Sequence, residues 1–257
     1  MTATAHLSID LNADLGEHDG EGAAADNAIL DLVTSANISC GGHAGSPGVM
    51  RLTVAAAKER GVAIGAHPGY PDRANFGRVE LDLPSHEIGE MLEKQIRELA
   101  SVCRDEHATL RYVKPHGAMY NRAARDDELA RVIAACIVRI DPALHVLALA
   151  GSALERAAHT AGLQVTAEAF IDRGYLADGM LVPRGHRGDL LTDPQIAAAR
   201  AVRMVTEHSG DAIDGTKLQL FPGSLCAHGD GAHALEMVKS TRKALGDAGI
   251  VIEAFAR

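Results

Sequence analysis

Short apolar runs alternate with longer segments of helical periodicity along the whole chain, and this alternation constrains the fold more than any other feature. The runs predicted as strands are Leu7–Leu11, Ala36–Ser39, Val62–Ala66, Thr109–Val113, His145–Ala150, Gln164–Ala167 and Leu225–Ala227, with a final strand at Ile250–Phe255. Apolar residues recur at the three- and four-residue steps of an amphipathic helix in Ser85–His107, Asp126–Ile140, Pro194–Glu207 and Gly231–Leu245. Strands separated by helices in this way lie parallel, with both faces of their sheet covered.

Two architectures satisfy this alternation, an open doubly wound sheet and a closed (β/α) barrel. Seven or eight strand–helix units in 257 residues match the size of a barrel. The Gly-x-Gly-x-x-Gly turn of dinucleotide-binding open sheets does not follow the first strand. We therefore predict an α/β fold, a TIM-like (β/α) barrel of seven or eight strands that forms a single domain over residues 1–257. Ser85 and Asp193 are the predicted N-caps of two of its helices.

The composition argues against several classes of protein. A hydrophobic fraction of 47% with 23% charged residues is typical of a globular chain and not of a disordered one. The net charge of −9 argues against general binding of nucleic acid, which depends on clustered basic residues. No run of 18 apolar residues is present and the first ten residues lack the features of a signal peptide, so we expect no membrane span. Four scattered cysteines fit a reducing cytoplasm, where we expect the protein to act.

Polar side chains lie in or directly after six of the seven predicted strands. They are Asp10, Asn12, Asp14, Cys40, His43, His67, Lys114, His116, Glu168, Asp172, Arg173, His228 and Asp230. The carboxyl ends of parallel strands in a barrel meet at one mouth, and barrel enzymes build their active sites there. We therefore expect these side chains to form one site.

Imidazole and carboxylate groups in this set are suited to a divalent metal. We predict a metal site of Asp14, His67 and His116, with His43 beside them, because such a set with an open position for water is typical of catalytic metals. The alternative is a pocket of hydrogen-bonded histidines without a metal. Lys114 is predicted to stabilise an oxyanion or to bind a carboxylate or phosphoryl group. Its alternative role is a structural ion pair.

Three further residues allow two interpretations each. Asp10 and Asp14 lie at alternate strand positions and so point to one face, which places both in a pocket. Alternatively, they form turn hydrogen bonds or cap the first helix. Cys40 is either a nucleophile beside His43 or a buried, inert thiol, and we prefer the second.

Motifs for nucleotide binding and for serine hydrolysis are missing. Gly210–Lys217 contains Gly, Thr and Lys but lacks the Gly that precedes the Lys of a phosphate loop, so we interpret it as a turn. No Gly-x-Ser-x-Gly elbow is present, which argues against that type of serine hydrolase.

Several multi-residue segments, in order along nearly the whole chain, resemble a known family. The segments are Asp10–Glu17, Ser35–Gly45, Gly65–Asp72 with Phe76–Arg78, Val113–Asn121, Phe170–Tyr175, Asp178–Gly179 with Leu181–Arg184, and His228–Asp230. This set resembles the LamB/YcsF family. The resemblance implies a (β/α) barrel related to the glycoside hydrolase and polysaccharide deacetylase superfamily. It also implies ATP-dependent hydrolysis of 5-oxo-L-proline (pyroglutamate) to L-glutamate, carried out together with B and C subunits.

The resemblance and the strand-end positions together give an expected role to each site residue. The expected catalytic residues are Asp14, His43, Lys114 and Glu168. The expected substrate-binding residues are Asn12, Asp172, Arg173, Arg184, His228 and Asp230. The expected metal ligands are Asp14, His67 and His116. Because the chain has no recognisable ATP loop, we expect ATP to be bound mainly by the partner subunits.

The chain departs from the family pattern at three places. An aromatic residue is usual at Gly42 and Asp is usual at Ser46, and the segment Arg184–Asp189 replaces a small, polar run. We expect these changes to flank the pocket and to affect the preferred substrate. Two other functions stay open. They are a stand-alone metal-dependent amide hydrolase or deacetylase, and a non-catalytic subunit that binds a small acid.

Overall fold

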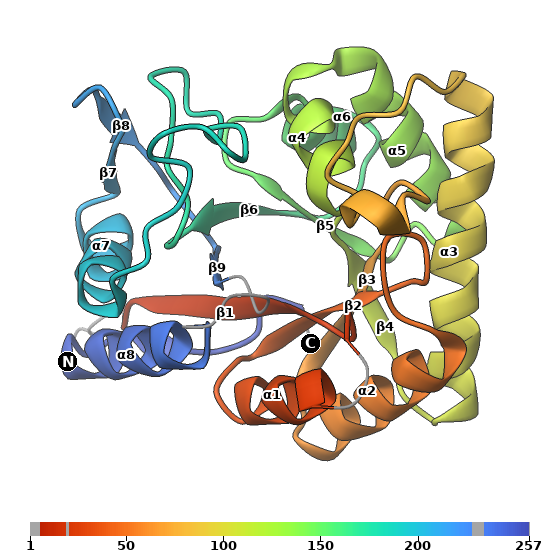
Figure 1. Ribbon diagram of the computed structural model, residues 1–257, viewed down its shortest axis with the longest axis horizontal. Coiled ribbons are helices and arrows are strands. Elements are labelled where there is room, and N and C mark those ends of the chain that lie inside the picture. Colours follow the sequence, from red (N-terminus) through yellow and green to blue (C-terminus); the bar gives the residue numbers. More distant parts are fainter. Residues whose placement is uncertain (1–5, 19–20, 228–233, 257) are drawn as a thin grey trace, which may run out of the picture.

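The chain folds into a closed barrel of parallel strands, seen in the computed structural model, which describes residues 6–18, 21–227 and 234–256 (Figure 1). The barrel strands are β1 (Ser8–Leu15), β2 (Ser35–Ser39), β3 (Ala63–His67), β4 (Leu110–Val113), β5 (His145–Leu149), β6 (Val165–Phe170) and β9 (Ser224–Ala227). Each strand pairs with the next in this order, and β9 pairs with β1 to close the ring. A short strand, β10 (Val251–Ile252), pairs with the start of β1. The prediction of a barrel of seven or eight strands is confirmed.

Helices cover the outside of the barrel (Figure 1). They are α1 (Glu21–Leu30), α2 (Pro47–Glu59), α3 (Ser85–Asp105), α4 (Gly117–Arg125), α5 (Asp127–Ile140), α6 (Ala153–Thr160), α7 (Pro194–Thr206) and α8 (Ala234–Asp247), with a 3-10 turn at Arg73–Asn75. The long helix α3 follows from its apolar spacing, which buries Ile88, Leu92, Ile96 and Leu99. No helix within the described residues is both long enough and apolar enough to cross a bilayer.

Local sequence explains most helix starts, with one correction. Asp193 caps α7 as predicted, accepting hydrogen bonds from the backbone N–H groups of residues 195 and 196. Ser46 caps α2 in the same way through Val49 N–H. Ser85 is not the cap of α3, because that helix begins directly after Pro84 and has no side-chain cap. The Ser85 hydroxyl instead donates to Glu128 of α5.

Two strands extend further than their apolar runs predict. β1 continues to Leu15 and β6 to Phe170, so Asp14 and Glu168 lie within strands and not after them. The apolar runs are shorter than the strands because the polar residues of these strands point into the barrel, where they bond across it. The segment 210–217 is also more than a turn. It joins two short antiparallel strands, β7 (Ser209–Asp211) and β8 (Lys217–Gln219), which form a separate hairpin.

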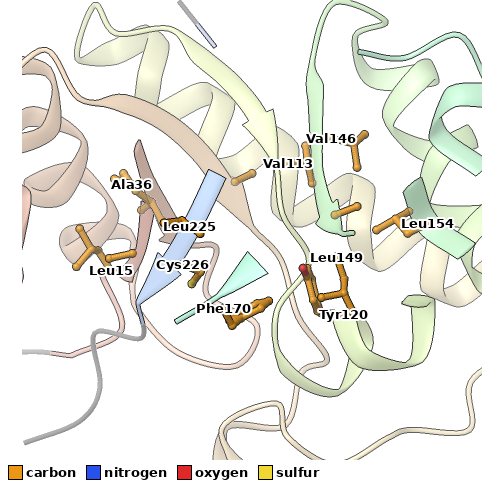
Figure 2. Packing of buried hydrophobic residues seen from close by; sticks show 14 of the residues in the cluster. Leu15, Ala36, Val113, Tyr120, Val146, Leu149, Leu154, Phe170, Leu225 and Cys226 are labelled. Carbon is orange, nitrogen blue, oxygen red and sulfur yellow. The ribbon is translucent and has the colours of Figure 1, made fainter. Parts of the chain in front are cut away.

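Apolar side chains fill the layer between strands and helices, while the inside of the barrel is largely polar. Figure 2 shows Leu15, Ala36, Val113, Val146 and Leu225 within the buried apolar cluster. Alternate residues of the same strands face the barrel interior. On β1 these are Asp10, Asn12 and Asp14, all of them buried. This alternation aims the functional side chains toward the mouth.

Candidate functional site

Two adjoining groups of polar side chains occupy the carboxyl ends of the strands. The first, here the lysine cluster, consists of Lys114 with Asp14, Glu168 and Cys226. The second, the histidine cluster, consists of Glu17, His43, His67 and His116. Asp14 connects them, because its Oδ1 lies 3.0 Å from Lys114 Nζ and its Oδ2 lies 3.3 Å from His67 Nε2.

The Lys114 ammonium is enclosed by acceptors. Its Nζ lies 3.0 Å from Asp14 Oδ1, 3.0 Å from Glu168 Oε1 and 3.1 Å from Cys226 Sγ. Burial by itself lowers the pKa of Lys114, but the adjacent Asp14, Cys226 and Glu168 outweigh it and raise the pKa well above the usual range. The lysine is therefore a cation held by two carboxylates, as in the ion-pair alternative, and its position at the mouth also allows it to stabilise a negative oxygen.

Hydrogen bonds from neutral groups fix the two carboxylates. Glu168 is fully buried and accepts from Asn12 Nδ2 at 2.9 Å and from the Tyr120 hydroxyl at 2.7 Å. Asp14 accepts from Asn37 Nδ2 at 2.7 Å. The Tyr120 ring packs edge-on against Phe170, and Figure 2 shows the two rings next to each other. The lysine cluster is thus rigidly built, with few alternative positions for its charges.

The histidine cluster has the composition and spacing of a metal site. One ligand atom from each of Glu17, His43, His67 and His116 lies within 4.8 Å of every other. The rings of His43 and His116 are stacked, with centroids 3.6 Å apart and an interplanar angle of 5°. His43 Nε2 lies 3.0 Å from Glu17 Oε1.

The hydrogen bonds of two histidines determine which nitrogens carry protons. His67 Nδ1 lies 2.8 Å from the Lys114 carbonyl and His116 Nε2 lies 2.8 Å from the Phe76 carbonyl. A carbonyl only accepts, so both of these nitrogens must be protonated. In the neutral rings, the lone pairs of His67 Nε2 and His116 Nδ1 then face each other at 2.9 Å. That arrangement is unfavourable unless a metal ion lies beside both nitrogens or one of them carries a proton.

These residues fit a divalent transition metal. Histidine ligands of metals usually donate the other ring N–H to a carbonyl or carboxylate, as His67 and His116 do. Burial, followed by the neighbouring His43 and His67, lowers the pKa of His116 well below the ordinary value. Burial also lowers the pKa of His43. Neutral imidazoles are the form that binds a metal, and three of them with a carboxylate suit Zn²⁺ or Fe²⁺.

A cavity of about 380 Å³ opens onto both clusters. Asp14, His116, Arg173 and Arg184 are among the residues that line it. A smaller cavity of about 30 Å³, bordered by Asp14, His67, Lys114 and Arg173, lies against it, since several residues line both. Both clusters therefore present side chains to a space that accommodates a small molecule.

Most of the predicted site residues are brought together here, but their surroundings differ. Asn12 and Glu168 are fully buried and do not line either cavity. Arg173 donates to the carbonyls of Val182 and Asp189, and burial, followed by Arg184, lowers its pKa to about 10. Two of its donors therefore hold the loop after β6.

The remaining predicted residues fall into three groups. Asp172 is buried beside Arg173. His228 and Asp230 lie outside the described residues. Cys40 is buried and donates to the Ile38 carbonyl, and burial raises its pKa, as expected for a core thiol.

Glu17 is the main residue that the sequence reasoning did not single out. It follows Gly16, whose φ of 71° turns the chain back toward the mouth. Glu17 lies in the turn beyond β1, so an argument from residues at strand ends does not include it. Its place at the end of the matched segment Asp10–Glu17 was the available signal.

The positions at which the chain departs from the family pattern do not line the cavity, with one exception. Ser46 caps α2, and Gly42 packs against Gln95 and Gly69, at the back of the histidine cluster. Only Arg184, of the departures, borders the 380 Å³ cavity. Gly42 thus flanks the histidine cluster without lining the cavity, and an effect of Gly42 and Ser46 on the preferred substrate stays a prediction.

Comparisons with known proteins match nearly the whole chain. The family model described as "LamB/YcsF family" matches residues 9–257. A relative from Neisseria meningitidis, named as the A subunit of 5-oxoprolinase, is 44% identical over 246 residues, covering 96% of this chain and 99% of the relative. A crystal structure of a "Lactam Utilization Protein" from Thermus thermophilus has a TM-score of 0.90 and 44% identity, covering 97% of this chain and 100% of that one. A peptidoglycan deacetylase from Bacillus subtilis, at a TM-score of 0.50 and 11% identity over 98% of this chain and 89% of that one, shares the fold alone.

Proposed function

Because this chain belongs to the LamB/YcsF family, we propose that it is the A subunit of a 5-oxoprolinase. In this proposal it hydrolyses 5-oxo-L-proline to L-glutamate with ATP and with B and C subunits. The names of its relatives support a lactam as substrate. The observation that carries the proposal is the position of Asp14, which joins a buried lysine to a cluster of histidines at one cavity.

The chemistry requires an activated lactam. A lactam carbonyl resists water because its amide is resonance-stabilised. Transfer of a phosphoryl group from ATP to the amide oxygen makes the ring carbon electrophilic. Water then adds to that carbon, and the ring C–N bond breaks as the nitrogen accepts a proton, which leaves a γ-glutamyl phosphate. A second water hydrolyses this acyl phosphate and releases phosphate and L-glutamate. We assign nucleotide binding mainly to the partner subunits.

Residues of this chain supply the remaining functions. Asp14 borders both cavities and accepts the proton of the attacking water. Lys114 places its positive charge where an oxygen becomes negative. Arg184 lines the cavity and binds the substrate carboxylate, while Arg173 holds the loop that forms the cavity wall.

The histidine cluster adds a metal to this proposal. Glu17, His43, His67 and His116 would hold a divalent ion. Such an ion, when bound, polarises a carbonyl oxygen and lowers the pKa of a bound water.

The same cluster favours a second candidate function. A chain that holds a metal at a barrel mouth can act as a stand-alone amide hydrolase, without ATP or partner subunits. The two functions differ in whether turnover depends on ATP.

The deciding experiment measures glutamate release from 5-oxoproline. The chain is assayed alone and with candidate B and C subunits, each with and without ATP. Asp14→Asn, which keeps the shape of the side chain, should lower turnover by about 10²–10⁴-fold if Asp14 is the general base. Asp31→Asn is the matched control, because Asp31 is exposed and forms its ion pair with Arg60, away from both clusters.

The outcomes separate the candidates. Release only in the complete mixture with ATP supports the oxoprolinase. Amide hydrolysis by the chain alone with a metal, and without ATP, supports the stand-alone hydrolase. Binding of 5-oxoproline without turnover in any mixture, with the subunits shown to associate, would indicate a subunit that only binds a small acid.

Metal binding is tested without activity. Zn²⁺ at 100 times its dissociation constant should raise the free energy of unfolding by about 2.7 kcal/mol, and a chelator should remove this gain. His67→Gln should abolish most of the gain, whereas the exposed His159→Gln should keep it. Equal stabilisation of both variants would contradict the assigned ligands.

A further inference from the structure

Gln95 of α3 lies outside both clusters, yet it bonds to the backbone that borders the histidines. The residue is only 6% exposed. Its Oε1 accepts from Gly69 N–H at 3.1 Å, and its Nε2 donates to the Gly69 carbonyl at 2.9 Å. Both polar atoms of one buried amide are therefore used on a single loop residue, two positions after His67.

Gly69 in turn presses against two histidines. A Cβ atom added at Gly69 would lie 2.8 Å from His43 Nδ1 and 3.2 Å from His116 Cβ. The same loop accepts a hydrogen bond from His116 N–H at the Pro68 carbonyl, at 2.8 Å. The loop is therefore packed directly against the stacked His43 and His116, with no space for a side chain between them.

Gly42 completes the contact from the other side. A Cβ atom at Gly42 would lie 2.5 Å from Gln95 Oε1 and 2.8 Å from the Gly69 carbonyl oxygen. Because Gly42 directly precedes His43, the Gln95 amide is packed between the loop that carries His43 and the loop that follows His67. The absence of a side chain at position 42 leaves the space that this amide occupies.

We propose that Gln95 is a positioning residue that sets the stacked geometry of His43 and His116 through Gly69 and Gly42. The inference rests on the proposed metal-binding role of the histidine cluster for its consequence, but the geometry itself does not require a metal. Outer groups that orient metal ligands typically change metal affinity by 10–100-fold when they are removed.

The test measures Co²⁺ binding to the full-length chain by visible absorption. Gln95→Met keeps the length of the side chain and removes both hydrogen bonds. It should weaken Co²⁺ binding by about 10–100-fold and alter the absorption spectrum. Gly42→Ala should have a similar effect, because its methyl group must displace the Gly69 carbonyl or Gln95. The double variant should be weakened by less than the product of the two single effects, since both act on one contact.

Ile96→Val is the matched control. Ile96 is a fully buried neighbour of Gln95 on α3 and belongs to the apolar cluster, so this change lowers stability without removing the Gly69 bonds. It should leave Co²⁺ affinity and the spectrum unchanged. If Ile96→Val weakens binding as much as Gln95→Met, or if Gln95→Met and Gly42→Ala bind like the wild type, Gln95 does not position the site.

A metal-free measurement keeps this inference separate from the proposed function. The imidazole nitrogen signals of His43 and His116 in the NMR spectrum report ring environment and tautomer. Gln95→Met should shift or broaden these signals in the apo chain, and Ile96→Val should not. If the wild type binds no Co²⁺, the metal assignment fails, while the His43 and His116 signals still decide the role of Gln95. Unchanged signals in Gln95→Met would overturn it.

Discussion

Two carboxylates on one strand, Asp10 and Asp14, have opposite surroundings inside the same barrel. Asp10 lies deeper and accepts hydrogen bonds from the hydroxyls of Thr34, Ser35 and Ser224. Asp14 lies at the mouth, beside the Lys114 ammonium. Burial raises the pKa of Asp10 to about 6, and the hydroxyl bonds only partly offset it.

The difference shows what turns a polar barrel interior into a site. Both carboxylates are buried, and both bond to well-placed neutral groups. Only Asp14 has a cation, imidazoles and a cavity beside it. Neutral donors satisfy hydrogen bonds, but they do not balance a charge, so the deep layer holds the barrel together while the mouth keeps stable ions for chemistry.

The largest effect is expected from removing the Lys114 cation at the barrel mouth. Lys114→Met leaves Asp14 and Glu168 buried without their shared counter-charge, and should lower the free energy of unfolding by about 3–5 kcal/mol. Urea unfolding at pH 7 measures the change. Lys94→Met, at an exposed position of α3, is the control and should change stability by at most about 0.5 kcal/mol. A loss below about 1 kcal/mol for Lys114→Met would show that the lysine cluster is not a tightly coupled ion group.

The next largest effect is the pH dependence of the free energy of unfolding that arises from Asp10, deep in the barrel. The pKa of Asp10 rises from the usual 3.8 to about 6, so the folded state binds this proton more tightly than the unfolded chain does. The stabilisation is complete below about pH 4 and is lost as pH rises through about 6, a change of about 3 kcal/mol for a shift of about two units.

Asp10→Asn cannot ionise and should remove this contribution. Its unfolding free energy, measured in urea from pH 4 to pH 7, should change by about 3 kcal/mol less than that of the wild type over this range. Asp31→Asn, at an exposed carboxylate, should follow the wild-type curve. Parallel curves for Asp10→Asn and wild type would mean that Asp10 ionises normally in the folded protein.

The smallest effects are expected from removing single hydroxyl groups, one beside Asp10 deep in the barrel and one beside Glu168 in the lysine cluster. Ser35→Ala removes a donor from Asp10, and Tyr120→Phe removes one from Glu168. Each should cost about 1–2 kcal/mol at pH 7. The cost of Ser35→Ala should shrink by pH 4, where Asp10 is protonated, whereas Tyr120→Phe should not show this trend. A cost of Ser35→Ala that does not change with pH would contradict the different ionisation of Asp10 and of the lysine cluster.

The sequence predicted the barrel and much of its mouth for one physical reason. Strand–helix alternation requires parallel strands, and parallel strands bring their carboxyl ends together. Asp14, His67 and Lys114 therefore converge as expected, although they are far apart in the chain. The ends of β1 and β6 were placed too early, because strand residues that face a polar interior do not look like an apolar run.

By itself, the sequence determined the alternation of barrel strands with helices, the Asp193 cap, and many of the residues that reach the mouth, because these depend on local periodicity and on chain direction. Only the tertiary structure decided that Glu17 joins three histidines, that Arg173 is committed to backbone carbonyls, and that Gln95 bonds to Gly69. These outcomes depend on side-chain contacts between segments that are distant in sequence. Such contacts follow from packing in three dimensions, which no local pattern encodes.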